Sequence, residues 1–480
     1  MKKSIKKNYI YNMIYQIIVI IIPIITTPYL ARRLGVNGNG IYSYTYSVVT
    51  FFILFGSLGI STYGQREIAY VQNDKEKISK ILFELLIIRF ITMTISALIF
   101  YFRFASHGVY SIYYKVLLLE MLANCIDIAW VFQGLEDFKK IVIRNLIIRI
   151  LSIFCIFIFI KGPNDVLKYV FITTFSSLFG SLTLWLGIKK YIKKPKKLEF
   201  KKHIPLIISL FIPQIAIQVY TVLDKTMLGS MLDDMVEVGY YEQAQKIIKI
   251  LLTVITAIST VMMPRIANCF AEGNDKQIKA YMMKTFRFVF LLAFPLMFGI
   301  IVVSNNFTPL FFGHGYDKVP ELISILSLLI VFISLGSVVG TQYLLSVKKQ
   351  KEYTISVIVG AIINFTLNLI LIRFYKSFGA AIATVVAELS VTTVQLYFVR
   401  KIFNIKEVLK ASINYFISGI IMFIVCLLID RIITSNIVCI SVQVLTGVII
   451  YFGMLFILRD KFLLDLINNN ILNRFKKGIR

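Results

Sequence analysis

Long apolar segments recur along almost the whole 480-residue chain, and they constrain the fold more than any other feature of the sequence. A helix needs about 20 apolar residues to cross the hydrocarbon core of a bilayer. Fourteen segments of about this length are present, separated by short stretches that are rich in charged or turn residues. Their approximate bounds are 9–34, 41–63, 81–104, 112–133, 141–160, 167–188, 205–231, 238–264, 285–304, 319–347, 354–374, 378–399, 412–432 and 436–458.

The composition supports a membrane protein and argues against a soluble enzyme. Hydrophobic residues make up 58% of the chain and charged residues only 16%, whereas soluble domains carry about 25% charged residues. The net charge of +27 would suggest a nucleic-acid partner for a soluble protein. In a membrane protein the location of the charges is more informative than their sum, and we expect no nucleic-acid partner.

Lysine and arginine alternate between the loops on the two sides of the predicted spans. If the N-terminus is cytoplasmic, 36 of the 52 basic residues fall in cytoplasmic segments and nine in external loops. This bias follows the positive-inside rule and predicts a multi-pass protein of the cytoplasmic membrane with both termini in the cytoplasm. The basic segment 189–204 is then a cytoplasmic linker that lies against anionic lipid headgroups.

Two similar motifs indicate an internal duplication. Gly40 is followed 26 residues later by Arg66, and Gly239 is followed 26 residues later by Arg265, each glycine opening a short Gly-x-Tyr motif. We therefore predict an all-α polytopic fold of two pseudo-symmetric six-helix lobes with two extra C-terminal helices. The expected parts are an N-terminal lobe (1–188), a basic linker (189–204), a C-terminal lobe (205–400), and two extra helices with a basic tail (401–480).

Several charged residues lie within the predicted spans, where a charge costs at least about 2.5–3.5 kcal/mol and so faces protein or water. Glu120 and Asp127, for example, share one helical face. Such charges either pair to join helices, or line a water-filled cavity whose spare cations bind a phosphate or pyrophosphate. The expected headgroup contacts are Arg89, Arg149, Lys225, Lys246 and Lys249. The expected charge partners or ion-coupling carboxylates are Asp127, Asp224, Glu120, Glu242 and Glu388.

The sequence lacks the common motifs of catalysis and metal binding. Its five cysteines form no C-x-x-C pair and its three histidines are far apart, so we expect no metal site and no catalytic residue. Phosphate-binding loops of the G-x-x-x-x-G-K-[ST] and G-x-G-x-x-G types are missing as well. We therefore expect no cofactor, and no use of ATP by the single chain.

Several short motifs occur in an order that resembles bacterial polysaccharide repeat-unit flippases of the multidrug/oligosaccharidyl-lipid/polysaccharide exporter superfamily. They are TPYLARRLG at 27–35, WVFQGLE at 130–136, DK at 224–225, GYYEQA at 239–244 and PR at 264–265. The resemblance implies transfer of an undecaprenyl-pyrophosphate-linked oligosaccharide from the inner to the outer leaflet by alternating access. It also implies coupling of this transfer to an H⁺ or Na⁺ gradient or to the membrane potential. Polymerisation into capsule, O-antigen or another exopolysaccharide would follow, with membrane lipids, a polymerase and chain-length machinery as partners.

Three alternatives differ in their chemistry. A multidrug antiporter of the same superfamily needs carboxylates inside the membrane and prefers cationic drugs, whereas the first span has no carboxylate and the inferred cavity is cationic. A lipid II flippase fits the cavity, but the motifs match it less well. A membrane glycosyltransferase or polymerase needs an acidic catalytic residue in a substantial loop, and the external loops are too short. We expect a transporter and not an enzyme.

Overall fold

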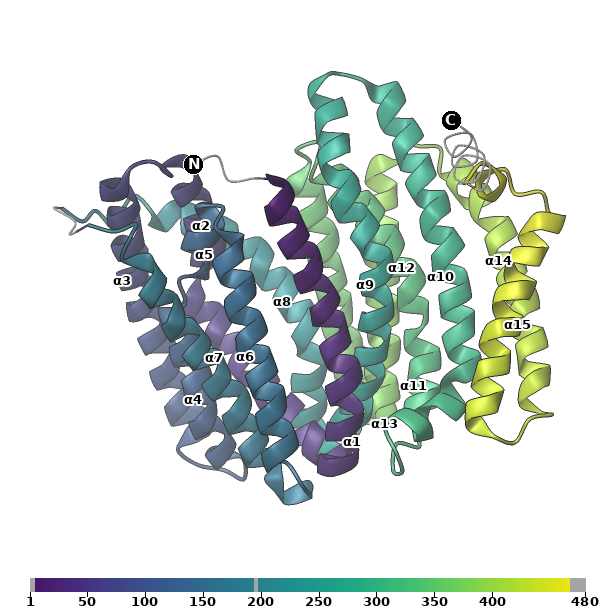
Figure 1. Cartoon of the computed structure of the whole chain (residues 1–480), viewed down its shortest axis with the longest axis horizontal. Coiled ribbons are helices and arrows are strands. Elements are labelled where there is room, and N and C mark those ends of the chain that lie inside the picture. The colour runs from purple at the N-terminus through teal and green to yellow at the C-terminus, as the bar shows by residue number, and fades with distance from the viewer. Residues whose placement is uncertain (1–4, 194–196, 467–480) are drawn as a thin grey trace, which may run out of the picture. The chain divides into compact units, whose positions relative to one another are not determined.

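The computed structural model describes residues 5–193 and 197–466, and these residues form helices without a β-strand (Figure 1). The helices that matter below are α1 (Ile5–Ser57), α2 (Ile60–Tyr70), α3 (Lys75–Phe100), α4 (Ser111–Ile126), α5 (Ala129–Gly134), α6 (Phe138–Phe159), α7 (Val166–Ile188), α8 (Ile204–Leu232), α9 (Met235–Ala271), α10 (Asp275–Phe311), α11 (Val319–Leu326), α12 (Leu328–Gly336), α13 (Gln350–Val399), α14 (Ile405–Asp430) and α15 (Asn436–Ile457).

The helices confirm a polytopic all-α membrane protein. In the part of the chain that the structure describes, ten helices are long and apolar enough to cross a membrane, or eleven if the bent pair Ile21–Ser57 and Ile60–Tyr70 is one span. Each predicted apolar segment lies on one or more of the helices and their short π-helical extensions, although α1 and α13 each contain two of the segments. The total of fourteen spans stays a prediction.

The first two apolar segments are joined in α1 by a backbone break at Gly35. This residue has φ +68° and ψ −179°, a conformation that glycine adopts without steric strain. Backbone carbonyls freed by a break inside a membrane need a partner. The Asn39 amide supplies one, because its Nδ2 donates to the Gly35 carbonyl at 2.7 Å and to the Leu30 carbonyl at 3.2 Å.

The repeated glycines lie where two backbones come very close. A Cβ on Gly40 would collide with the carbonyl of Met235, and a Cβ on Gly239 would collide with the carbonyl of Val36. All four residues belong to the same compact part of the chain. Steric contact therefore explains why both positions are glycine, since any larger residue would push these backbones apart.

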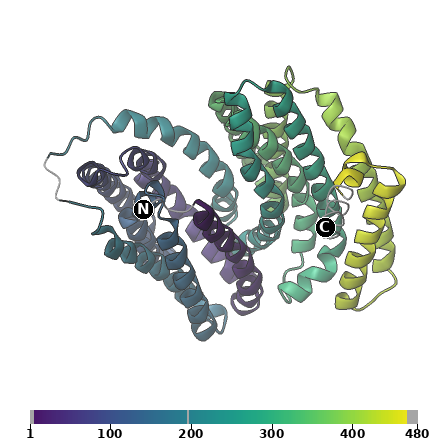
Figure 2. The ribbon, with the colours of Figure 1, turned by 45° about the horizontal axis from the view of Figure 1, so that its top comes forward.

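The described residues form two compact units, one up to Gly239 and the other from Tyr240. In the first unit, α4 and α6 both pack against α7, and α1 packs against α3 (Figures 1 and 2). In the second unit, α10 packs against both C-terminal helices, α14 and α15. Helix α8 belongs to the first unit by its contacts, so the described residues of the predicted 189–204 linker, 189–193 and 197–204, lie within that unit. The expected lobe boundaries stay a prediction of the repeat.

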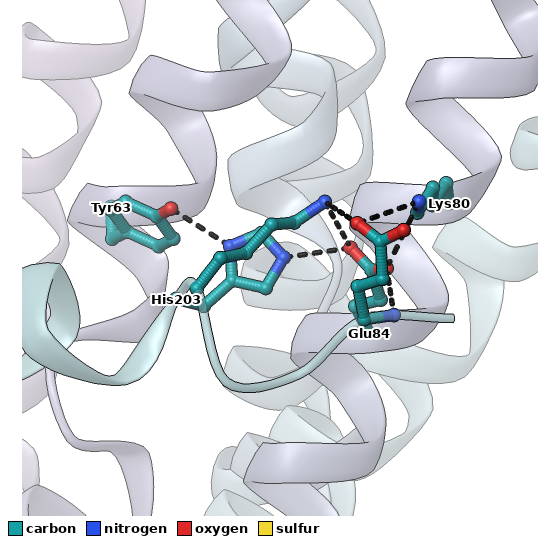
Figure 3. A network of polar contacts seen from close by, with 6 residues as sticks. Tyr63, Lys80, Glu84 and His203 are labelled. Atoms are coloured by element: carbon teal, nitrogen blue, oxygen red, sulfur yellow. Dashed lines mark hydrogen bonds and ion pairs between the residues drawn. The ribbon is translucent and has the colours of Figure 1, made fainter. Parts of the chain in front are cut away.

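A buried carboxylate fixes the end of the basic linker to α3 (Figure 3). Glu84 is fully buried and accepts hydrogen bonds from His203 Nε2 at 2.7 Å and from the backbone amide of Glu199. The other ring nitrogen of His203 lies 2.8 Å from the Tyr63 hydroxyl. Lys202 lies 3.5 Å from Glu84 and adds a positive charge. We call Tyr63, Glu84, Glu199, Lys202 and His203 the linker clasp.

The outer side of the linker clasp is electrostatic. Lys80 Nζ lies 3.1 Å from the Glu199 carboxylate, and Lys202 lies 3.4 Å from it. The hydrogen bond and charge of Lys80, followed by those of Lys202, hold the pKa of Glu199 below its usual value. The linker therefore packs against α3 through both a buried and an exposed set of contacts.

Candidate functional site

A polar cavity of about 490 Å³ lies between α1, α4, α6 and α7 in the first unit. Glu120, Asn124 and Asp127 from α4 and its C-terminal end form one wall, and Asn145, Arg149 and Ser152 from α6 form another. Glu120, Asp127 and Arg149 are among the charged residues that the sequence places inside predicted spans. We call this cavity the α1–α7 pocket, and its lining residues are Tyr42, Tyr46, Glu120, Ala123, Asn124, Asp127, Arg144, Asn145, Ile148, Arg149, Ser152, Thr173, Ser176, Ser177, Gly180 and Ser181.

Hydrogen bonds fix the carboxylate side of the α1–α7 pocket. Ser177 Oγ donates to Glu120 Oε1 at 3.0 Å and so connects α7 to α4. Asn124 Nδ2 lies one helical turn beyond and donates to the Glu120 carbonyl at 3.0 Å and to Oε1 at 3.4 Å. A carboxylate inside a membrane needs such donors because it has left water. The Glu120 carboxylate is therefore held in one orientation.

Helix α4 ends at the bottom of the same pocket because the backbone becomes extended at Asp127. The break leaves carbonyls without helical partners. Arg89 donates to the Asp127 carbonyl at 2.8 Å and to the Asn124 carbonyl at 3.3 Å. Trp185 Nε1 donates to the Ile126 carbonyl at 2.9 Å. Side chains from α3 and α7 thus supply the missing bonds.

Arg89 therefore has a different setting from the one expected for a headgroup contact. Its side chain is 1% exposed and also donates to Ser61 Oγ at 2.7 Å, and it does not line the α1–α7 pocket. These contacts place it behind the pocket wall, where it stabilises the α4 end and so positions Asp127. A direct contact between Arg89 and a substrate stays a prediction.

Sequence reasoning missed three kinds of pocket residue. Arg144 lies inside α6, and its guanidinium lies over Gly180, where a Cβ would be 3.0 Å from Nη1. Tyr42 and Tyr46 stack one turn apart on α1, with ring centroids 5.6 Å apart. The hydroxyls of α7 recur at i, i+4 and i+8 in an apolar segment, a signal that was available in the sequence. They are Thr173, Ser177 and Ser181.

Other predicted site residues lie in the second unit on α9 and α13. Glu242 and Lys246, which lie one helical turn apart on α9, form an ion pair at 3.4 Å. Lys249 is exposed, and its Nζ lies 3.0 Å from Gln245 Oε1. Glu388 is buried at 8% exposure on the inner face of α13. Their roles in binding or ion coupling stay predictions.

One hydrogen bond connects the polar residues of α9 to those of α13 in the second unit. The Tyr241 hydroxyl on α9 lies 2.9 Å from Thr384 Oγ1 on α13, and Gln245 Nε2 donates to the same hydroxyl at 3.4 Å. Lys249, Gln245, Tyr241 and Thr384 thus form a continuous polar row, with Glu388 one turn beyond Thr384. Asp224 and Lys225 belong to the first unit, on α8, where Asp224 is buried and Lys225 is half-buried.

The fold of this chain is also found in solved structures of membrane transporters. A solved structure of lipid II flippase MurJ in an inward closed conformation matches with a TM-score of 0.72 and 20% sequence identity, covering 94% of this chain and 99% of that chain. An inward-facing multidrug resistance MATE family transporter of the MOP superfamily matches with a TM-score of 0.61 and 13% identity, covering 82% of this chain and 99% of that chain. At these identities the likeness concerns the fold alone.

The family follows from the sequence itself. The model of the family described as polysaccharide biosynthesis protein matches residues 5–270, and the MatE model matches residues 209–370. The chain belongs to the polysaccharide biosynthesis protein family, and the resemblance found in its motifs is confirmed.

Relatives with full-length similarity carry names from surface polysaccharide synthesis. A protein of Escherichia coli K12 whose name describes an O-antigen transporter is 24% identical over 412 residues, covering 83% of this chain and 97% of that protein. Capsular polysaccharide biosynthesis protein CapF of Staphylococcus aureus is 24% identical over 385 residues, covering 77% and 93%.

Proposed function

We propose that this protein is a flippase. It moves undecaprenyl-pyrophosphate-linked oligosaccharide repeat units from the inner to the outer leaflet by alternating access, for the synthesis of a surface polysaccharide. Membership of the polysaccharide biosynthesis protein family carries this proposal. The α1–α7 pocket supports it, because a polar cavity between membrane-spanning helices gives the hydrophilic part of such a lipid a place away from the hydrocarbon core.

The proposal includes the membrane and the orientation. The distribution of 36 of the 52 basic residues on one side supports a cytoplasmic membrane protein with both termini in the cytoplasm. The protein acts as a transporter and not as an enzyme, and it delivers its lipid-linked product to a polymerase and chain-length machinery.

Transport is coupled to an H⁺ or Na⁺ gradient or to the membrane potential. The carboxyls of Asp127, Asp224 and Glu388 are candidates for this coupling, and those of Asp224 and Glu388 are buried. A carboxyl that is shielded from water binds a cation or a proton reversibly as its surroundings change. The polyprenyl chain stays in the lipid while the headgroup crosses.

Deletion of the gene followed by lipid analysis tests the function. A flippase for repeat units leaves a polyprenyl-linked oligosaccharide on the cytoplasmic face, and expression of the wild-type chain removes it. Loss of viability with accumulated lipid II would assign the protein to cell-wall synthesis instead. Unchanged lipid intermediates with altered drug tolerance would assign it to multidrug export.

A further inference from the structure

The α1–α7 pocket is polar on nearly every side. Thirteen of its sixteen lining residues carry a polar side-chain group, and the exceptions are Ala123, Ile148 and Gly180. A wall of this kind is unfavourable between membrane-spanning helices unless it surrounds water or a polar ligand. Its volume of about 490 Å³ is within the range of about 300–1,000 Å³ that is usual for small-ligand sites.

The charges on the wall balance one another. Two guanidinium groups, Arg144 and Arg149, share the pocket with two carboxyl groups, Glu120 and Asp127. Arg144 interacts electrostatically with Asp127, and Glu120 is fixed on the wall by Ser177. A ligand with two or more negative charges would therefore meet two carboxylates as well as two guanidinium groups, so the wall offers it no excess of positive charge, while the carboxylates repel it in a medium of low dielectric constant. The wall suits an uncharged ligand better than a pyrophosphate.

Aromatic rings and small hydroxyls complete the wall. Tyr42 stacks on Tyr46, and Tyr169 packs against Tyr42 with ring centroids 4.5 Å apart, so the tyrosine pair is held in place. A pyranose ring has an apolar C–H face that packs on an aromatic ring, and hydroxyls at its edge that both donate and accept hydrogen bonds. Hydroxyl and amide side chains such as Thr173 and Asn145 offer both functions as well.

We propose that the α1–α7 pocket is a saccharide site that holds a neutral sugar residue of the translocated lipid-linked oligosaccharide, and not its pyrophosphate. This assignment rests on the proposed flippase function. It specifies which part of the substrate is bound, a sugar residue, and where it is bound, the α1–α7 pocket. It also reverses the expectation of a cationic, anion-binding cavity for this part of the chain, because Arg149 shares its cavity with Glu120 and Asp127.

Two neighbouring threonines on α7 offer a matched test. Thr173 lines the pocket, whereas Thr174 is fully buried outside it, and both hydroxyls also bond to backbone carbonyls of the preceding turn. Thr173→Val and Thr174→Val remove the same hydroxyl with nearly the same shape. Asn145→Leu removes a second pocket group from α6. Thermal unfolding in detergent establishes that each variant is folded.

The probes separate the sugar from the phosphate. They are the repeat-unit oligosaccharide, released from its polyprenyl lipid by mild acid, and inorganic pyrophosphate, each titrated calorimetrically into the purified full-length protein. We expect Thr173→Val to weaken oligosaccharide binding about two- to tenfold, as for the loss of one hydrogen bond. Asn145→Leu weakens it at least as much, Thr174→Val leaves it unchanged, and none of the three changes pyrophosphate binding.

Flipping by the wild-type protein in proteoliposomes is measured separately, so that the two proposals fail separately. A wild type that flips the lipid but does not bind the free oligosaccharide overturns the saccharide site and leaves the flippase standing. The same holds if Thr173→Val and Asn145→Leu bind it as tightly as wild type, or weaken pyrophosphate binding instead. A wild type that flips no lipid-linked oligosaccharide refutes the proposed function.

Discussion

Glu84→Ala should release the basic linker from α3. The carboxylate is fully buried and receives hydrogen bonds from His203 Nε2 and from the amide of Glu199. Removing it leaves both donors unpaired, at a cost of about 1–3 kcal/mol each. The two unpaired donors together give about 3 kcal/mol for local opening of the clasp. This corresponds to about a hundredfold larger open population.

Limited proteolysis measures this opening. Lys201 and Lys202 are trypsin sites on the docked stretch, and cleavage tracks the open population when opening is fast relative to cutting. We expect cleavage after these lysines, identified by mass spectrometry, to be about a hundredfold faster in Glu84→Ala. Glu67→Ala is the control, because it removes an exposed pair with Arg66 that contributes at most about 1 kcal/mol.

The result can refute the argument in two ways. Equal cleavage rates for wild type and Glu84→Ala would show that the linker clasp does not hold the linker. An acceleration of the same size in Glu67→Ala would show that trypsin reports general loosening of the protein. Glu84→Gln should give an intermediate rate, because the amide keeps one acceptor oxygen for His203 but loses the charge that attracts Lys202.

Three further predictions concern packing, hydrogen bonding and pH. Gly64→Ala should lower stability by about 1–3 kcal/mol, because the added Cβ would collide with the Trp130 ring. Gly299→Ala is the control, because no atom lies within 4 Å of the added Cβ. This control should leave the melting temperature in detergent nearly unchanged. Tyr241→Phe should lower stability by about 1 kcal/mol, because it removes the hydrogen bond to Thr384 on α13. In a double-mutant cycle with removal of the Thr384 hydroxyl, the two losses of stability should not add. Additive losses would exclude the bond. Because the pKa of Glu199 is lowered in the folded protein, its carboxylate stabilises the docked linker at any pH above the unfolded-state pKa of about 4.3. This contribution is lost as the pH falls through the lower folded-state pKa. Linker protection in hydrogen exchange, corrected for intrinsic rates, should therefore be constant from about pH 8 to about pH 5 and decline only below about pH 4; a decline near pH 6 would contradict this.

Much of the architecture could be read directly from the sequence. The length of each apolar segment is dictated by the bilayer, so hydropathy alone located helices that the structure confirms. Glu120, Asp127 and Arg149 could also be identified from the sequence as candidate site residues. A charge is costly in hydrocarbon, so a charged residue in an apolar segment needs a specific reason. Each of these signals is local in sequence and depends on the solvent more than on the partners.

The tertiary structure decided which of those charges belong together and what each one contacts. Arg89 and Arg149 look alike in the sequence, yet one is buried against carbonyls at the end of α4 and the other lines the α1–α7 pocket. Glu84, near the end of a predicted span, is the fully buried centre of a clasp whose partner His203 is 119 residues away. The apolar segments determine where the helices lie in the sequence and that they cross the membrane. The contacts that each side chain makes depend on how helices that are distant in sequence pack together. For that reason the composition of the pocket, and its balance of charge, came only from the structure.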